Sequence, residues 1–229
     1  MSSSERINWI RRLWLQRMIA AGIMGTLWRG GGRQALALPA PPPRSILHRR
    51  KGIVEINGVP ADVGTPVASG DQISTGPDSE AVFVLGDDGF LLRADSQVTI
   101  TDLGQDRTTG KAMRELTLVS GRVLSVFGPK QISLKTPLAS IGIRGTAAYL
   151  ESSPASMNVC VCYGHAVMTP EGAPKLAEEV ENHHHETPRV VFPGPNGPVM
   201  EALRIDNHSD DELIMLEALL GRVPPFLPK

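Results

Sequence analysis

The stretch Ile53-Val54-Glu55-Ile56-Asn57-Gly58-Val59 decides the fold class of this 229-residue chain. A short run of β-branched residues meets Asn57-Gly58, a pair that tolerates positive φ and therefore favours a tight hairpin. Val59 begins the return strand. The pattern recurs downstream, where Asp87-Asp88-Gly89 separates the apolar runs at 81–85 and 90–92. This part of the chain is therefore expected to form β-hairpins.

Outward from this hairpin, the same kind of pattern continues from residue 52 to about residue 168. Short apolar runs are each closed by a turn signal, and no long window repeats every 3.6 residues. Further strands are expected at 97–101, 115–119, 122–127, 131–135, 147–150 and 157–163. We predict an all-β fold, either a β-sandwich or a short β-solenoid of about ten short strands.

One helix is predicted after the strands. Ser209-Asp210-Asp211-Glu212 has the pattern of a capping box, and Gly221 is placed to end the helix. The segment 210–220 has a broad apolar surface, and a helix this short needs a docking surface to persist. We therefore expect it to pack on the β domain, where His208 would approach the strands. The segment Pro188 to Pro198 is expected to be a crossing loop.

The first 37 residues have the pattern of an export signal. They carry six arginines and one glutamate, whereas the remainder of the chain is acidic. Arg11-Arg12-Leu13-Trp14 resembles the twin-arginine export motif, and a weakly apolar segment follows it. We expect the mature chain to begin at Leu38, with a Pro-rich and basic linker at 38–51. An amphipathic helix lying on a membrane surface is the alternative interpretation of residues 1–37.

Composition excludes several functions. No stretch reaches the roughly 18 to 20 apolar residues of a membrane span, so the mature chain is expected to lack one. The balance of 23 basic and 24 acidic side chains argues against a nucleic-acid partner. We find no nucleophile elbow, no phosphate-binding loop and no His-Glu-x-x-His helix. The chain is therefore predicted not to be an enzyme.

The two cysteines and a group of histidines are the candidate functional residues. Cys160 and Cys162 are two apart in a predicted strand, so their side chains share one face, opposite Val159, Val161 and Tyr163. Two thiolates and two imidazoles make a tetrahedral shell for zinc, and copper or iron accepts the same ligands. The predicted ligands are Cys160, Cys162, His183 and His184, with His185 and His208 as substitutes.

Other interpretations of these residues stay open. Two lone cysteines in an oxidising compartment commonly form a disulfide, although i and i+2 on a flat strand lie about 6.6 Å apart at Cα, near the upper limit for a bridge. A Cys-x-Cys thiol-exchange pair and two inert buried thiols are further alternatives. The histidines would then form a solvated loop.

The strand region resembles the FecR domain. The resemblance rests on 52–58, on Gly70-Asp71-Gln72-Ile73-Ser74-Thr75-Gly76, and on Ile143-Arg144-Gly145-Thr146 near the end. It covers residues 52–168 and implies an extracytoplasmic β domain, periplasmic here, of the kind best known from sensors of iron-siderophore uptake. A cell-envelope protein partner is the corresponding expectation. Residues 169–229 then form an extension that holds the histidine loop and the helix. Arg144-Gly145-Thr146 itself is expected to be a bend where a large side chain does not fit.

Overall fold

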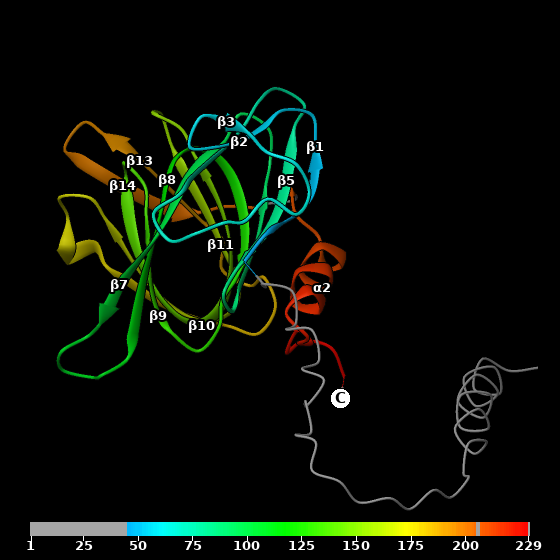
Figure 1. The fold of residues 1–229 in the computed structure, drawn as a ribbon. Helices are drawn as coiled ribbons and strands as arrows, with labels where there is room; N and C mark the ends of the chain where they lie inside the picture. Colours follow the sequence, from blue (N-terminus) through cyan, green and yellow to red (C-terminus); the bar gives the residue numbers. More distant parts are fainter. Residues whose placement is uncertain (1–44, 205–206, 229) are drawn as a thin grey trace, which may run out of the picture. The chain divides into compact units, whose positions relative to one another are not determined.

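The computed structural model describes residues 45–204 and 207–228 (Figure 1). The predicted export signal at 1–37 and the first part of the predicted linker lie outside the described residues. Residues 48–51 were expected to be the solvated end of that linker, but they lie in strand β1 (Leu47–Lys51), which pairs with β5 (Glu80–Leu85). The fold begins here because Leu47 is fully buried in the core. No helix in the described residues has the length and apolarity that crossing a membrane requires.

The described residues form a mostly β structure with a single α-helix, α2 (Asp210–Leu219). This confirms the predicted all-β class with one C-terminal helix. Fourteen strands, rather than about ten, join in one sheet. After β1 they are β2 (Val54–Ile56), β3 (Val59–Pro60), β4 (Gln72–Thr75), β5 (Glu80–Leu85), β6 (Asp88–Leu92), β7 (Gln97–Gln105), β8 (Ala112–Val126), β9 (Gln131–Lys135), β10 (Ala139–Ser152), β11 (Met157–Pro170), β12 (Glu178–Asn182), β13 (Arg189–Gly194) and β14 (Gly197–Ala202).

The sheet folds around one apolar core because its three longest strands change neighbours along their length. The first half of β10 pairs with β9 and its second half pairs with β8, while β11 pairs first with β13 and later with β12. All pairs of neighbouring strands in the described residues are antiparallel, except that β8 and β9 pair in parallel. Phe83 and Phe90 of one part of the sheet therefore meet Ile100, Leu116 and other residues of another part in the core.

The change of neighbours in β10 occurs at Arg144-Gly145-Thr146, where a bend was predicted. A bend was expected there because a large side chain would not fit, but a Cβ on Gly145 would meet nothing within 4 Å. The constraint is conformational instead, because Gly145 has φ +58. Gly164 of β11 combines φ +93 with a close approach, since a Cβ there would lie 2.7 Å from Thr146 Oγ1. These two glycines allow β10 and β11 to bend together.

A second apolar cluster lies on the outside of the sheet, under α2. The helix buries Leu213 and Leu216, and Leu220 follows at its end. Figure 1 shows α2 beside the strands, near the C-terminal end of the chain. The helix begins as predicted, because the Ser209 N–H donates to Glu212 Oε2 at 3.0 Å. It ends at Leu219, one residue earlier than expected, and Gly221 adopts φ +70.

The predicted crossing loop at Pro188–Pro198 is instead the hairpin of β13 and β14. Pro193 and Pro198 face each other near its turn. They are tolerated because β14 is an edge strand and only residues 189–191 of β13 bond to β11. The predicted turn at Asp87-Asp88-Gly89 is displaced in a similar way. Asp88 begins β6 and is fully buried, with Arg114 as its ion-pair partner.

Candidate metal centre

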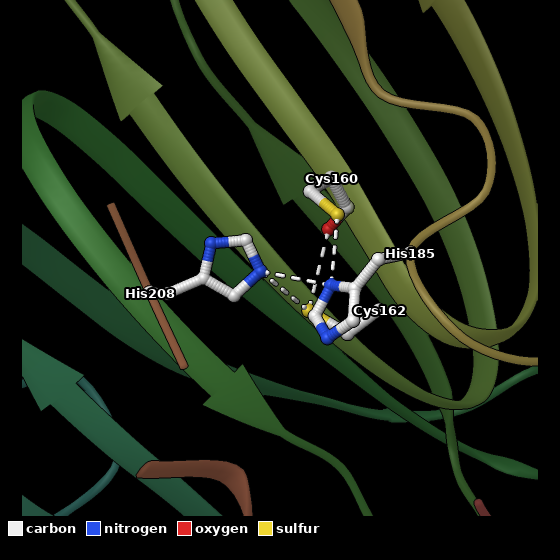
Figure 2. A group of neighbouring side chains, drawn as sticks. All are labelled: Cys160, Cys162, His185 and His208. Atoms are coloured by element: carbon white, nitrogen blue, oxygen red, sulfur yellow. Dashed lines mark hydrogen bonds between the residues drawn. The ribbon is translucent and has the colours of Figure 1, made fainter. Parts of the chain in front are cut away.

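Two cysteines and two histidines meet on the outer face of β11 (Figure 2). Cys160 Sγ lies 3.3 Å from His185 Nδ1, and Cys162 Sγ lies 3.4 Å from His208 Nε2. The two imidazole nitrogens are 3.1 Å apart. All four atoms lie within 4.8 Å of one another. Both cysteines are buried, with exposed fractions of 1% and 0%.

These separations are close to the edges of a zinc-centred tetrahedron. Zinc–sulfur bonds of about 2.3 Å and zinc–nitrogen bonds of about 2.0–2.1 Å give edges of roughly 3.3 Å between nitrogens and roughly 3.6 Å between nitrogen and sulfur. The observed nitrogen–nitrogen and nitrogen–sulfur distances are shorter by a few tenths of an ångström. These three contacts would need to lengthen by only a few tenths of an ångström around an ion, and the remaining ligand–ligand distances are within 4.8 Å.

Strand alternation places both sulfurs on the outside of the sheet, and a β-bulge at Cys162 follows. Tyr163 pairs with Ala147 and Val161 pairs with Ala148, so Cys162 is an extra residue in β11. Val159 and Val161 belong to the inner core, as the alternation predicted, and the cysteines belong to the outer cluster. Tyr163 was expected on the inner side. It joins the cysteines on the outer side because the bulge interrupts the alternation.

His185 reaches the cysteines from the connection between β12 and β13. Its backbone has φ +55, and its N–H donates to the Cys162 carbonyl at 3.0 Å. The Asn182 side-chain amide holds the same connection to β11 by donating to the Val161 carbonyl at 2.7 Å. Two direct hydrogen bonds to the cysteine strand thus fix the position of the imidazole.

His208 comes from the segment that leads into α2. Its ring stacks on Tyr149 of β10, with centroids 4.7 Å apart and an angle of 8° between the planes. Tyr149 pairs with Cys160 across the two strands, so the stacked ring is held beside the sulfurs. Among the described residues, His208 Nδ1 has no hydrogen-bond partner although it is buried.

The structure places the other two predicted histidine ligands outside this cluster. His183 and His184 are exposed, and their backbone N–H groups donate to Glu186 Oε2. His184 Nε2 lies 2.8 Å from Asp210 Oδ1, and its ring packs on Phe226. The residues brought together are thus Cys160, Cys162, His185 and His208. The substitutes, rather than the first two histidines chosen, meet the sulfurs.

Asp210 and Tyr149 are functional candidates that the sequence analysis missed. Asp210 Oδ1 lies 3.3 Å from His185 Nε2, the nitrogen on the far side of the ring from Cys160. A carboxylate in this position orients a metal-binding histidine. The sequence holds one weak signal for it, because Asp210 follows His208 by two residues at the start of a predicted helix. Nothing in the sequence indicates the stacking of Tyr149.

The electrostatics of the cluster favour one deprotonated sulfur. A hydrogen bond from Cys162 lowers the pKa of Cys160 against the effect of burial, and the two imidazoles lower it further. Burial raises the pKa of Cys162 well above its usual range. The hydrogen bond to Cys160 is the main reason that the pKa of His185 is raised. Cys160 therefore has thiolate character, the form in which sulfur binds metals.

The arrangement suits a structural ion better than a catalytic one. Four protein ligands complete a tetrahedron, and catalytic zinc sites keep a position open for water or substrate. Glu186, the acidic residue next to His185 in the sequence, would be a candidate general base. Its carboxylate instead accepts hydrogen bonds from the backbone N–H groups of His183 and His184 in its own turn. The cysteines are free thiols in the structure, which leaves both available as ligands.

A family model agrees with the resemblance seen in the sequence. Residues 71–167 match a family model described as FecR protein. No curated protein matches the chain. Two crystal structures of a "putative anti-sigma factor" from Parabacteroides distasonis ATCC 8503, at 1.65 and 2.50 Å resolution, are similar to it, each with 13% identity. Each covers 63% of this chain and 71% of the other, with TM-scores of 0.45 and 0.44. The chain therefore contains a FecR domain, which the family model places at residues 71–167.

Proposed function

We propose that this protein is an exported, non-enzymatic FecR-domain protein that binds one transition metal ion. The observation that carries the proposal is the convergence of Cys160, Cys162, His185 and His208. Three pairs of their ligand atoms, Cys160 with His185, Cys162 with His208 and His185 with His208, lie 3.1–3.4 Å apart. The donors come from positions up to 48 residues apart in the sequence, from Cys160 to His208. Local chain geometry alone does not bring such residues together.

The donor set favours zinc over the other metals predicted. Two sulfurs and two imidazole nitrogens at tetrahedral spacing match structural zinc sites. Copper and iron accept the same donors, whereas the soft sulfurs disfavour calcium and magnesium. The burial of Cys160 and Cys162 supports a closed site that exchanges its ion slowly.

Export supports the proposed site in a second way. The twin-arginine route carries proteins that are already folded, so an ion inserted in the cytoplasm would travel with the chain. We therefore assign the mature protein to the periplasm, with an export signal at 1–37, a linker from residue 38 to the start of β1 at Leu47, a FecR-like domain that runs on to residue 168 and an extension at 169–229. The boundaries after residues 37 and 168 rest on the sequence pattern.

A second candidate function is a protein-interaction or signalling module of the cell envelope. The match of residues 71–167 to the FecR family favours it, because the sequence resemblance implies a relation to envelope sensors. In this alternative Cys160 and Cys162 form a disulfide or a thiol-exchange pair, and the partner is another envelope protein. Metal content together with the free-thiol count separates the two candidates.

Elemental analysis of the protein recovered from the periplasm tests the proposal. We expect about one zinc, copper or iron ion per chain, and loss of that ion in the double variant Cys160→Ser/Cys162→Ser. His183→Ala is the matched control, because His183 is an exposed histidine of the same turn as His185. Native protein without metal and without titratable thiols would instead identify a disulfide and refute the proposal.

A further inference from the structure

The four candidate ligands come from two parts of the chain, the cysteine strand with the turn bonded to it and the segment that leads into α2. Cys160, Cys162 and His185 lie on β11 and on the turn bonded to it. His208 lies two residues before Asp210, the first residue of α2. We propose that the ion controls whether α2 stays docked on the outer face of the sheet. This inference rests on the proposed metal binding and adds a regulated conformational change to it.

The surface under α2 is apolar and needs a cover. Val82, Leu91, Leu124 and Tyr149 contribute to the outer cluster that the helix leucines complete. Exposure of a contiguous apolar patch of this kind on a soluble protein is unusual. The occupant in the structure is α2, so release of α2 exposes this patch.

Docking of α2 has identifiable costs that make it sensitive to one added bond. The helix has only ten residues and does not persist when detached. The docked arrangement leaves Tyr149 Oη and His208 Nδ1 buried without hydrogen-bond partners among the described residues. It also buries the Glu217 carboxylate, which needs both Tyr163 and Arg222 as partners. These costs partly offset the free energy that α2 gains by burying its leucines.

The ion would act directly on the start of the helix. A bond to His208 Nε2 fixes the ring that already stacks on Tyr149. Asp210 Oδ1 contacts both His184 and His185, so the first residue of α2 is also tied to the turn that supplies another ligand. Without the ion, the start of α2 keeps the ion pair of Glu212 with Arg93 and the contact of Asp210 with His184. Among the described residues, His208 then keeps only its contacts with Cys162, His185 and Tyr149.

Thermodynamic linkage gives the inference a second, independent consequence. If the ion favours the docked helix by some factor, docking favours ion binding by the same factor. Leu216→Ala removes a fully buried side chain of α2 and replaces none of the four ligands. It should therefore weaken zinc binding although every donor atom remains.

Hydrogen exchange of the purified full chain, with zinc or with a chelator, measures the docking of α2. We expect the amides of α2 to exchange about tenfold or more slowly with zinc, within the usual range of coupling between sites. His185→Ala and His208→Ala are a matched pair, because each removes one imidazole ligand. At saturating zinc, α2 should remain protected in His185→Ala and lose the zinc-dependent protection in His208→Ala.

The outcomes distinguish this inference from the proposed function. Zinc bound stoichiometrically, with equal exchange of α2 in zinc and in chelator, would overturn the inference and leave the metal site intact. Absence of zinc binding to folded protein would overturn both. If His208→Ala unfolds the chain, the zinc affinity of Leu216→Ala decides, since an unchanged affinity contradicts the linkage.

Discussion

Loss of His208 should remove most of the stabilisation that zinc gives to the protein. At a free zinc concentration of about 1,000 times Kd, binding to the native state alone stabilises it by about 4.1 kcal/mol. One kcal/mol shifts Tm by roughly 2–4 °C in a chain of this size, so zinc should raise the Tm of the native protein by about 8–16 °C. We expect zinc to bind the native state preferentially because the fold holds all four donor atoms close together.

Removing one of the four ligands weakens binding at least as much as the loss of an outer-shell partner, for which about 100-fold is the upper end. At the same zinc concentration the stabilisation of His208→Ala then falls to about 1.4 kcal/mol, and the Tm increase to about 3–6 °C. His183→Ala should behave like the native protein, because the exposed His183 lies outside the cluster. Differential scanning calorimetry with zinc and with chelator is the assay. Equal zinc-dependent shifts in the native protein and in His208→Ala would refute the reasoning.

Two further predictions concern the metal centre, and a third concerns a buried ion pair of the fold. Asp210→Asn should weaken zinc binding about 10- to 100-fold in a chelator competition, because Asp210 orients His185, and the exposed neighbour Asp211→Asn should have no effect. Zinc affinity should fall as the pH is lowered from about 8 to about 6, since the pKa of His185 is raised and zinc must displace its proton; an affinity independent of pH would argue against imidazole ligation. Asp88→Ala should destabilise the protein by about 1–3 kcal/mol in urea unfolding, because Arg114 and the Gly128 N–H lose a buried acceptor while Arg114 keeps Asp102 as an ion-pair partner; a loss below about 0.5 kcal/mol would contradict that role.

Local sequence patterns predicted the parts of the fold that short-range chemistry controls. Asn57 and Gly58 both adopt positive φ between β2 and β3, as their residue types require. Ser209 and Glu212 start α2 and Gly221 follows its end. In each case the deciding contacts lie within a few residues, so one stretch of sequence contains the information.

Long-range pairing decided the features that the sequence did not predict. The hairpin of β13 and β14 contains Pro193 and Pro198, and it exists because β11 offers residues 157–159 as a partner. The β-bulge at Cys162 depends on the pairing of β11 with β10. A reading of one strand at a time assumes strict alternation and therefore places Tyr163 on the wrong face.

The candidate site shows the same division. The spacing of Cys160 and Cys162 indicated a shared face, and the structure brings histidines from the predicted segments to that face. Three consecutive histidines are equivalent in sequence, and the turn geometry distinguishes them. His185 points to the sulfurs because its backbone has φ +55, whereas His184 is directed to Asp210 and Phe226.

X-ray absorption at the zinc edge of the zinc-loaded full chain tests the proposed ligand set most directly. The account predicts a first shell of two sulfurs at about 2.3 Å and two nitrogens at about 2.0–2.1 Å. Both sulfurs should disappear from that shell in Cys160→Ser/Cys162→Ser. A shell of nitrogen and oxygen alone in the native chain would contradict the proposed centre.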